Sequence, residues 1–173
     1  KPEGFETVPF FVGAYPFDAD AIYWPEGERD VETLARLGLA AFTFGGTGDG
    51  LPDGCAAYVG GRSVVILSDN DSAGRKHAED KAAAVHGVAA SVRVVHFPDT
   101  GDKGDVSDWI GAGHTAEELI ERAAGTAEWS NEQDRDREAV ATDKSSADQI
   151  PSADHAERHL TARAEKKSAL PPG

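Results

Sequence analysis

The chain has 173 residues, of which 31 are acidic and 17 are basic, so its formal net charge is −14. This charge repels phosphate backbones, so if the domain handles nucleic acid, metal ions or neighbouring domains must supply the positive charge. The sequence has one cysteine, Cys55, which excludes an intrachain disulfide and a cysteine zinc cluster and is typical of a cytoplasmic protein. No apolar run approaches the roughly 20 residues that span a bilayer, and we expect no membrane contact.

Strand and helix patterns alternate along the middle of the chain. Short apolar runs bounded by turn residues predict strands, and apolar residues at helical spacing predict helices. The predicted strands are 21–25, 40–44, 63–68 and 91–97, and the predicted helices are 28–37, 72–87, 106–110 and 115–124. Strands that alternate with helices favour parallel pairing and right-handed crossovers. We therefore predict an α/β domain over residues 20–125, with a mostly parallel four-stranded sheet flanked by helices.

The flanking segments differ from this domain in composition. Residues 1–19 are predicted to lead in from an upstream region, because the chain starts at Lys1 without a methionine and is expected to be a piece of a longer protein. Residues 126–173 are rich in Asp, Glu, Ser, Ala and Lys, and this composition buries little apolar surface. We predict a polar linker or disordered tail there, with a transient helix around 153–167.

Acidic residues follow three of the predicted strands. In open parallel sheets, functional sites form where the carboxyl ends of the strands meet. The fold would therefore bring together acids that are far apart in the sequence. These are Glu26 and Asp30 after the first strand, Asp69 and Asp71 after the third, and Asp105 and Asp108 after the fourth.

Carboxylates crowded into one cleft need a counter-charge, which Mg²⁺ or Mn²⁺ supplies through oxygen ligands. Two such ions about 4 Å apart can clamp the attacking and leaving oxygens of a phosphoryl transfer. Gly74 and the following helix start offer backbone N–H groups to a phosphate, and Arg75 offers a forked contact. Arg29 and Lys103 are further candidates for phosphate binding.

Each acidic segment also has a purely local interpretation. Asp69-Asn-Asp71 after a strand is a common composition for a turn and an N-cap, and taken alone it favours that interpretation. Glu26 to Asp30 alone fits a solvated helix start. The occurrence of all three segments at strand ends, in the right order, favours a site.

Three stretches together resemble the TOPRIM domain. "YWPEGERDVETLARLG" resembles its first motif, a strand followed by Glu-Gly-x-x-Asp. "VVILSDNDSAGRKHA" resembles its second motif, in which Asp-x-Asp follows a strand and Ala-Gly-Arg follows in primase-type members. "DKGDVSDWI" is similar to a Lys-Asp-x-x-Asp segment of phage- and plasmid-type primases and primase–helicases. Two residues depart from the pattern: Pro25 directly precedes Glu26, and Gly104 separates Lys103 from Asp105.

The resemblance covers residues 20–124 and implies a Rossmann-like TOPRIM fold with Mg²⁺-dependent phosphodiester chemistry. It implies that Glu26 is a general acid/base in cleaving members and a metal-site residue in primases, and that Asp69 and Asp71 are metal ligands. Asp30, Asp105 and Asp108 would complete the acidic site. The predicted function is nucleotidyl transfer by a DNA primase-like replication protein. Its partners would be a single-stranded DNA template and nucleoside triphosphates, with a helicase or zinc-binding domain elsewhere in the full protein.

Three other functions remain open. The first is a metal-dependent nuclease on the same scaffold, with Glu26 as acid/base. The second is a non-catalytic module that binds metal and nucleotide or docks a helicase. The third, ranked last, is a phosphatase with Asp69 as nucleophile, since this would leave Glu26 without a role.

The remaining features carry weaker signals. The glycine-rich stretch 45–54 lacks the Gly-Lys-Ser/Thr of a phosphate-binding P-loop and is predicted to be a connection. Trp109 is predicted to be a core anchor that fixes the acidic loop, and Cys55 to be buried and unreactive. Four scattered histidines are expected at the surface or its boundary: His77, His86, His96 and His114.

Overall fold

The computed structural model describes residues 7–46, 48 and 50–131. Three strands form one sheet in the order β1-β2-β3, and both neighbouring pairs are parallel. The strands are β1 (Ala21–Trp24), β2 (Ser63–Ser68) and β3 (Ser91–His96). The helices are α1 (Glu28–Arg36), α2 (Ser72–Val85), α3 (Val106–Gly111) and α4 (Ala116–Gly125), with short 3-10 helices η1 (Pro16–Asp18) and η2 (Cys55–Val59). The predicted α/β class with a parallel sheet is confirmed.

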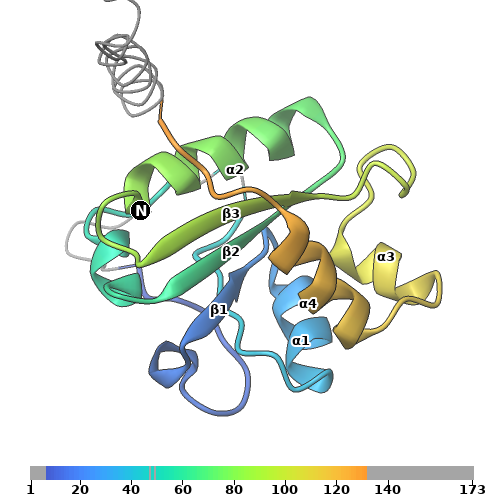
Figure 1. Ribbon diagram of the computed structural model, residues 1–173, viewed down its shortest axis with the longest axis horizontal. Helices are drawn as coiled ribbons and strands as arrows, with labels where there is room; N and C mark the ends of the chain where they lie inside the picture. The colour runs from blue at the N-terminus through green and yellow to red at the C-terminus, as the bar shows by residue number, and fades with distance from the viewer. Residues whose placement is uncertain (1–6, 47, 49, 132–173) are drawn as a thin grey trace, which may run out of the picture. The chain divides into compact units, whose positions relative to one another are not determined.

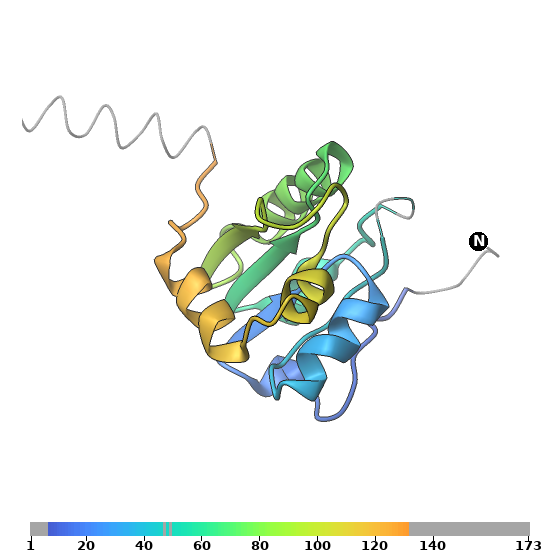
Figure 2. The ribbon, with the colours of Figure 1, turned by 90° about the vertical axis from the view of Figure 1, so that its right-hand side faces the viewer.

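The sheet separates two apolar layers, because successive strand residues point to opposite faces. Helix α2 packs on one face, and α1, α3 and α4 pack on the other (Figures 1 and 2). On the α2 face, Trp24 and Ile66 contact a cluster of aromatic residues. On the opposite face, Tyr23 and Val65 pack among residues of the other three helices, including Trp109, which is buried as predicted.

The predicted strand 40–44 does not form a fourth strand of the sheet. It makes two isolated bridges, one between Ala41 and Tyr23 and one between Thr43 and Phe10. The backbone at Ala40 and Phe42 bonds to Tyr23 at 2.8 and 3.1 Å, whereas Thr43 bonds to Phe10 on its other side. The segment thus divides its hydrogen bonds between two neighbours, so neither pairing extends into a ladder. The described sheet has three strands.

Residues outside the predicted domain of 20–125 also belong to the compact unit. Phe17 is buried, and its ring centroid lies 4.8 Å from that of Phe42. At the other end, the backbone N–H of Trp129 donates to Val92 at 2.8 Å. The unit therefore continues to Asn131. The tail predicted beyond it, with a helix around 153–167, lies outside the described residues.

Helix α2 begins very close to the end of β2. The Asp71 side chain caps α2 and accepts a hydrogen bond from the Gly74 N–H at 2.7 Å. A Cβ atom added at Gly74 would lie 2.7 Å from the Asp69 Cβ and 3.0 Å from its carbonyl oxygen. A glycine at this position therefore allows the first turn of α2 to pack against the strand end. Across the described ranges, no helix has both the length and the apolar character needed to cross a membrane.

This close approach predicts that Gly74→Ala destabilises the domain. The added methyl must displace backbone of Asp69, so we expect a loss of about 1–3 kcal/mol in the free energy of unfolding. Gly111→Ala is the matched control, because a Cβ there meets no atom within 4 Å and a change between neutral and about 1 kcal/mol of stabilisation is expected. Urea unfolding measures both. Equal effects of the two substitutions would contradict the packing argument.

Candidate functional site

Two of the predicted acids meet at the carboxyl ends of adjacent strands. Glu26 follows β1 and Asp69 follows β2, and the register that pairs Trp24 with Ile66 brings these ends together. Their carboxyl groups share a hydrogen bond, which requires a proton on one of them. Burial and the nearby carboxylates of Glu26, Asp30 and Asp105 raise the pKa of Asp69 to about 7. The pair is therefore crowded and partly buried. When both carboxyl groups are ionised they repel each other, and a cation between them would relieve this repulsion.

Asp30 is placed differently from this pair. It is only 4% exposed, and its Oδ1 atom accepts hydrogen bonds from the Ser107 hydroxyl at 2.5 Å and the Ser107 N–H at 3.3 Å. Burial raises the pKa of Asp30, while the bonds from Ser107 oppose this shift. This carboxyl group ties α1 to α3, so its first role is to hold two helices together beside the site.

The other three acids cap helices. Asp71 caps α2, as the local interpretation of its motif predicted. Asp105 caps α3, and its Oδ1 accepts from the Asp108 N–H at 2.8 Å. The Asp108 carboxylate accepts in return from the Asp105 N–H at 3.4 Å, completing a capping box. The fold thus brings the six predicted acids to one end of the sheet, where four of them accept hydrogen bonds from the backbone or from Ser107. These four are Asp30, Asp71, Asp105 and Asp108.

The predicted phosphate-binding cations surround the acids at exposed positions. Arg29 forms ion pairs with Asp108 at 3.1 Å and with Asp105 at 3.6 Å. Arg75 donates to the Asn70 Oδ1 at 3.3 Å, and the Lys103 N–H donates to the Asn70 carbonyl at 3.3 Å. These guanidinium and ammonium groups remain open to solvent, so an anion at the strand ends can reach them.

Asn70 also explains the inserted Gly104. The Asn70 amide donates to the carbonyls of Thr100 and Gly101, and the Asn70 N–H donates to the Gly104 carbonyl at 2.8 Å. A Cβ at Gly104 would lie 2.5 Å from the Thr100 side chain. The turn that brings the loop after β3 against Asn70 is therefore too tight for a side chain at this position.

Lys81 is a site residue that the sequence interpretation missed. It is 1% exposed, and its ammonium group donates to the Pro25 carbonyl at 3.0 Å. Burial lowers the pKa of Lys81 to about 8, while the carboxylates of Glu26, Asp69 and Asp30 act to raise it. Its charge therefore lies among the acids as an internal cation. Helical spacing was the available signal, because Lys81 falls on the same face as Ala78 and Val85.

His77 precedes Lys81 by one helical turn, and its predicted place at the surface is wrong. It is 6% exposed, and neither ring nitrogen has a hydrogen-bond partner. The Nδ1 atom lies 4.0 Å from the Glu26 carboxylate. Burial lowers the pKa of His77. The positive charge of Lys81 lowers it further, whereas the negative charge of Glu26 raises it. An unsatisfied buried imidazole costs on the order of 1–3 kcal/mol of stability.

The carboxylates at the strand ends limit how a metal ion could bind. Within the described ranges, no group of three or more His, Cys, Asp or Glu side chains is arranged to hold a metal ion. Magnesium, however, commonly uses only one or two protein carboxylates and takes water and substrate phosphate for the rest of its shell. Glu26 and Asp69 together fit this requirement, because they are adjacent oxygen donors whose mutual repulsion a divalent cation relieves.

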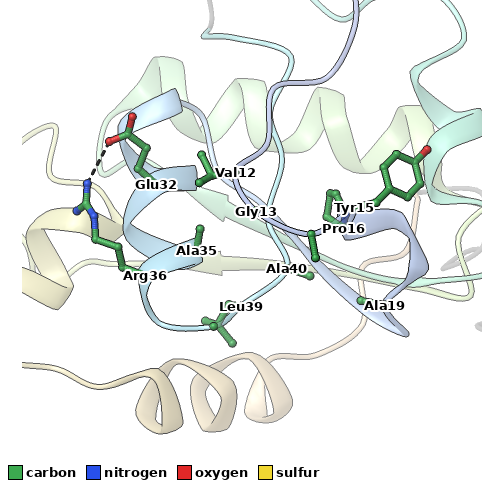
Figure 3. A pocket seen from close by; sticks show the side chains of 12 residues that line it. Val12, Gly13, Tyr15, Pro16, Ala19, Glu32, Ala35, Arg36, Leu39 and Ala40 are labelled. Carbon is green, nitrogen blue, oxygen red and sulfur yellow. Dashed lines mark hydrogen bonds and ion pairs between the residues drawn. The ribbon is translucent and has the colours of Figure 1, made fainter.

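Another hollow on the surface lies away from these acids. Its volume is about 610 Å³, and it is lined by residues around η1, by the second half of α1 and by the residues that follow α1 (Figure 3). Val12, Tyr15 and Leu39 contribute to its lining, and the ion pair between Glu32 and Arg36 spans 3.1 Å at its edge. None of the predicted acids lines it, so the chemistry of the strand ends and this hollow are separate.

Comparison with protein-family models finds none that matches the chain, and a search of curated proteins also finds no match. The resemblance to TOPRIM domains therefore rests on the three motifs, and it stays a prediction.

The raised pKa of Asp69 predicts a pH-dependent effect of Asp69→Asn. The folded state favours the protonated carboxyl, so its contribution to stability is present near pH 4 and is lost as the pH rises through about 7. Asparagine stays neutral throughout. We expect the variant to match the wild type near pH 4 and to be more stable at pH 8, by on the order of 2 kcal/mol after solvent screening.

Urea unfolding at several pH values between 4 and 8 tests this expectation. Asp102→Asn is the control for the loss of an exposed carboxylate. A difference between Asp69→Asn and wild type that stays constant with pH would show that the Glu26–Asp69 pair is not crowded in solution.

Proposed function

We propose that this domain is the TOPRIM-type catalytic module of a cytoplasmic DNA primase-like replication protein, and that it performs nucleotidyl transfer with Mg²⁺ or Mn²⁺. The observation that carries the proposal is the Glu26–Asp69 pair at the carboxyl ends of two parallel strands. Two ionised carboxyl groups held next to each other repel, so the arrangement by itself does not stabilise the protein at high pH. A divalent cation with a phosphate ligand gives the arrangement a purpose.

Each part of the site then has a chemical task. When bound, the metal ion stabilises negative charge on the phosphoryl oxygens during transfer. Glu26 and Asp69 are its proposed ligands. Arg29, Arg75 and Lys103 lie at exposed positions around them and are proposed to orient phosphates of the nucleotide or template. Because the chain carries a charge of −14, these cations and the metal supply the local attraction for a single-stranded DNA template.

The non-catalytic module considered from the sequence binds metal and nucleotide or docks a helicase. Lys81 favours a metal-independent form of it, which is the second candidate function. An ammonium group buried among the acids partly neutralises them without any metal. In this case the acidic site would bind no metal, and Lys81 would hold its carboxyl groups in place. The positive charge that attracts a nucleotide would come from elsewhere in the protein. The two functions differ in whether the wild-type protein binds Mg²⁺.

Calorimetric titration with Mg²⁺ tests the metal site. We expect Asp69→Asn and Glu26→Gln each to weaken Mg²⁺ binding at least tenfold, because each removes one of two charged ligands. Glu117→Gln, which neutralises an exposed acid in the first turn of α4, should bind as the wild type does. If all three variants bind Mg²⁺ equally, the assignment of Glu26 and Asp69 as ligands is wrong.

Replacing the internal cation separates the two candidate functions. We expect Lys81→Met to tighten Mg²⁺ binding more than tenfold, because a positive charge that repels the metal is removed. Lys76→Met, on the same helix but exposed and paired with Asp80, is the control. The catalytic proposal requires that the wild type binds Mg²⁺, whereas binding that occurs only in Lys81→Met supports the non-catalytic module. Circular dichroism checks that both variants fold.

Product analysis then identifies the reaction. The protein is incubated with single-stranded DNA, the four nucleoside triphosphates and Mg²⁺. New primers that disappear in Asp69→Asn support the primase proposal, whereas shortened template strands identify a nuclease on the same scaffold. Binding of Mg²⁺ with neither product, in the longest version of the protein, would overturn the catalytic proposal.

A further inference from the structure

A second hollow is separated from the acidic pair by the ring of His77. Its volume is about 470 Å³, which is within the range of small-ligand pockets. Helix α2 forms one wall, and two residues of the glycine-rich stretch 45–54 form the other. The lining consists of Gly50, Leu51, Ala73, Lys76, His77 and Asp80.

His77 connects this pocket to the proposed metal ligands. Its ring lines the pocket, and its Nδ1 atom lies 4.0 Å from the Glu26 carboxylate. The glycine-rich stretch also lies close to this carboxylate, since a Cβ added at Gly46 would lie 3.5 Å from the Glu26 Oε1. A molecule with its phosphates at Glu26 and Asp69 can therefore extend into the pocket past His77.

The unpartnered ring of His77 indicates what the pocket accepts. It is almost fully buried, yet both nitrogens lack hydrogen-bond partners. A neutral imidazole offers one N–H donor and one acceptor nitrogen. A ligand hydroxyl can accept from the N–H or donate to the other nitrogen, so it can bond to either side of the ring. Because both nitrogens are buried, the ring must turn toward the pocket for a ligand hydroxyl to reach one of them.

The charges around the pocket argue against an anion within it. Lys76 is paired with Asp80 at 2.6 Å, so the rim carries no net charge. A phosphate there would face the Asp80 carboxylate, while Leu51 and Ala73 contribute apolar surface. A neutral ligand with an apolar ring and hydroxyl groups fits this lining. The nucleoside part of a nucleotide has both.

We propose that this pocket receives the nucleoside of the incoming nucleoside triphosphate, with His77 hydrogen-bonded to a sugar hydroxyl. The identity of the ligand rests on the proposed function. A template-directed enzyme must accept four different bases, and the sugar is the part that all four nucleotides share. A contact from His77 to the sugar therefore serves every incoming nucleotide equally.

Adenosine without metal is the direct probe of the pocket. Ligand-observed NMR with the 173-residue chain in EDTA compares the wild type with His77→Leu, which removes the donor and acceptor, and His77→Gln, which keeps both. We expect His77→Leu to weaken adenosine binding about tenfold and His77→Gln to retain it within about threefold. His96→Leu, which replaces an exposed histidine, should have no effect.

Adenine, which lacks the sugar, separates the sugar contact from general damage to the pocket. It should bind the wild type and His77→Leu equally. A wild type that does not bind adenosine, or an adenosine affinity that His77→Leu leaves unchanged, would overturn the inference. Equal weakening of adenine and adenosine would also overturn it, because His77 would then only shape the pocket.

A parallel titration of ATP with Mg²⁺ keeps this inference distinct from the proposed function. If adenosine binding depends on His77 but Asp69→Asn does not affect ATP binding, the pocket stands and the metal site fails. If ATP binding depends on Asp69 but adenosine binding does not depend on His77, the metal site stands and the nucleoside pocket fails.

Discussion

The arrangement of the site depends on one electrostatic constraint, the burial of Lys81 beside Glu26 and Asp69. The ammonium group reaches the Pro25 carbonyl from α2 at 3.0 Å, so it links the helix to the end of β1. For this contact to form, α2 must start close against β2. Gly74 permits that approach because it has no Cβ. The position of α2, the shape of the strand ends and the charge balance of the site therefore depend on the same contact.

The charged groups of the site differ between its interior and its surface. In its interior, two carboxyl groups share a hydrogen bond next to the buried cation, where low solvent access makes each charge costly. At the surface, Arg29 pairs with two helix-capping aspartates, and such exposed pairs contribute little stability. The proposed divalent cation would therefore gain most from displacing the interior proton, whereas the proposed phosphate would gain most from the exposed cations.

The sequence predicted the order of strands and helices well because buried strands and amphipathic helices have distinct periods. It failed at 40–44, where an apolar run that is typical of a strand divides its backbone bonds between Tyr23 and Phe10. For the acids, it predicted their meeting at one sheet end but not their division of roles. An aspartate after a strand has the same sequence pattern whether it caps a helix, as Asp71 does, or faces a neighbouring carboxyl, as Asp69 does.

His77 and Lys81 show what the pattern of α2 contains beyond its apolar residues. A helix that only covered the sheet would have apolar side chains at both positions, because a buried unpaired imidazole and a buried ammonium each reduce stability. Both residues lie one turn apart on the inward face, and both act on Glu26, one at 4.0 Å and the other through its charge. Lys81 has a structural partner in the Pro25 carbonyl, whereas the unpartnered imidazole of His77 is the feature that favours the proposed ligand. His77 and Lys81, the two polar residues on the buried face of α2, therefore say more about the site than its apolar residues do.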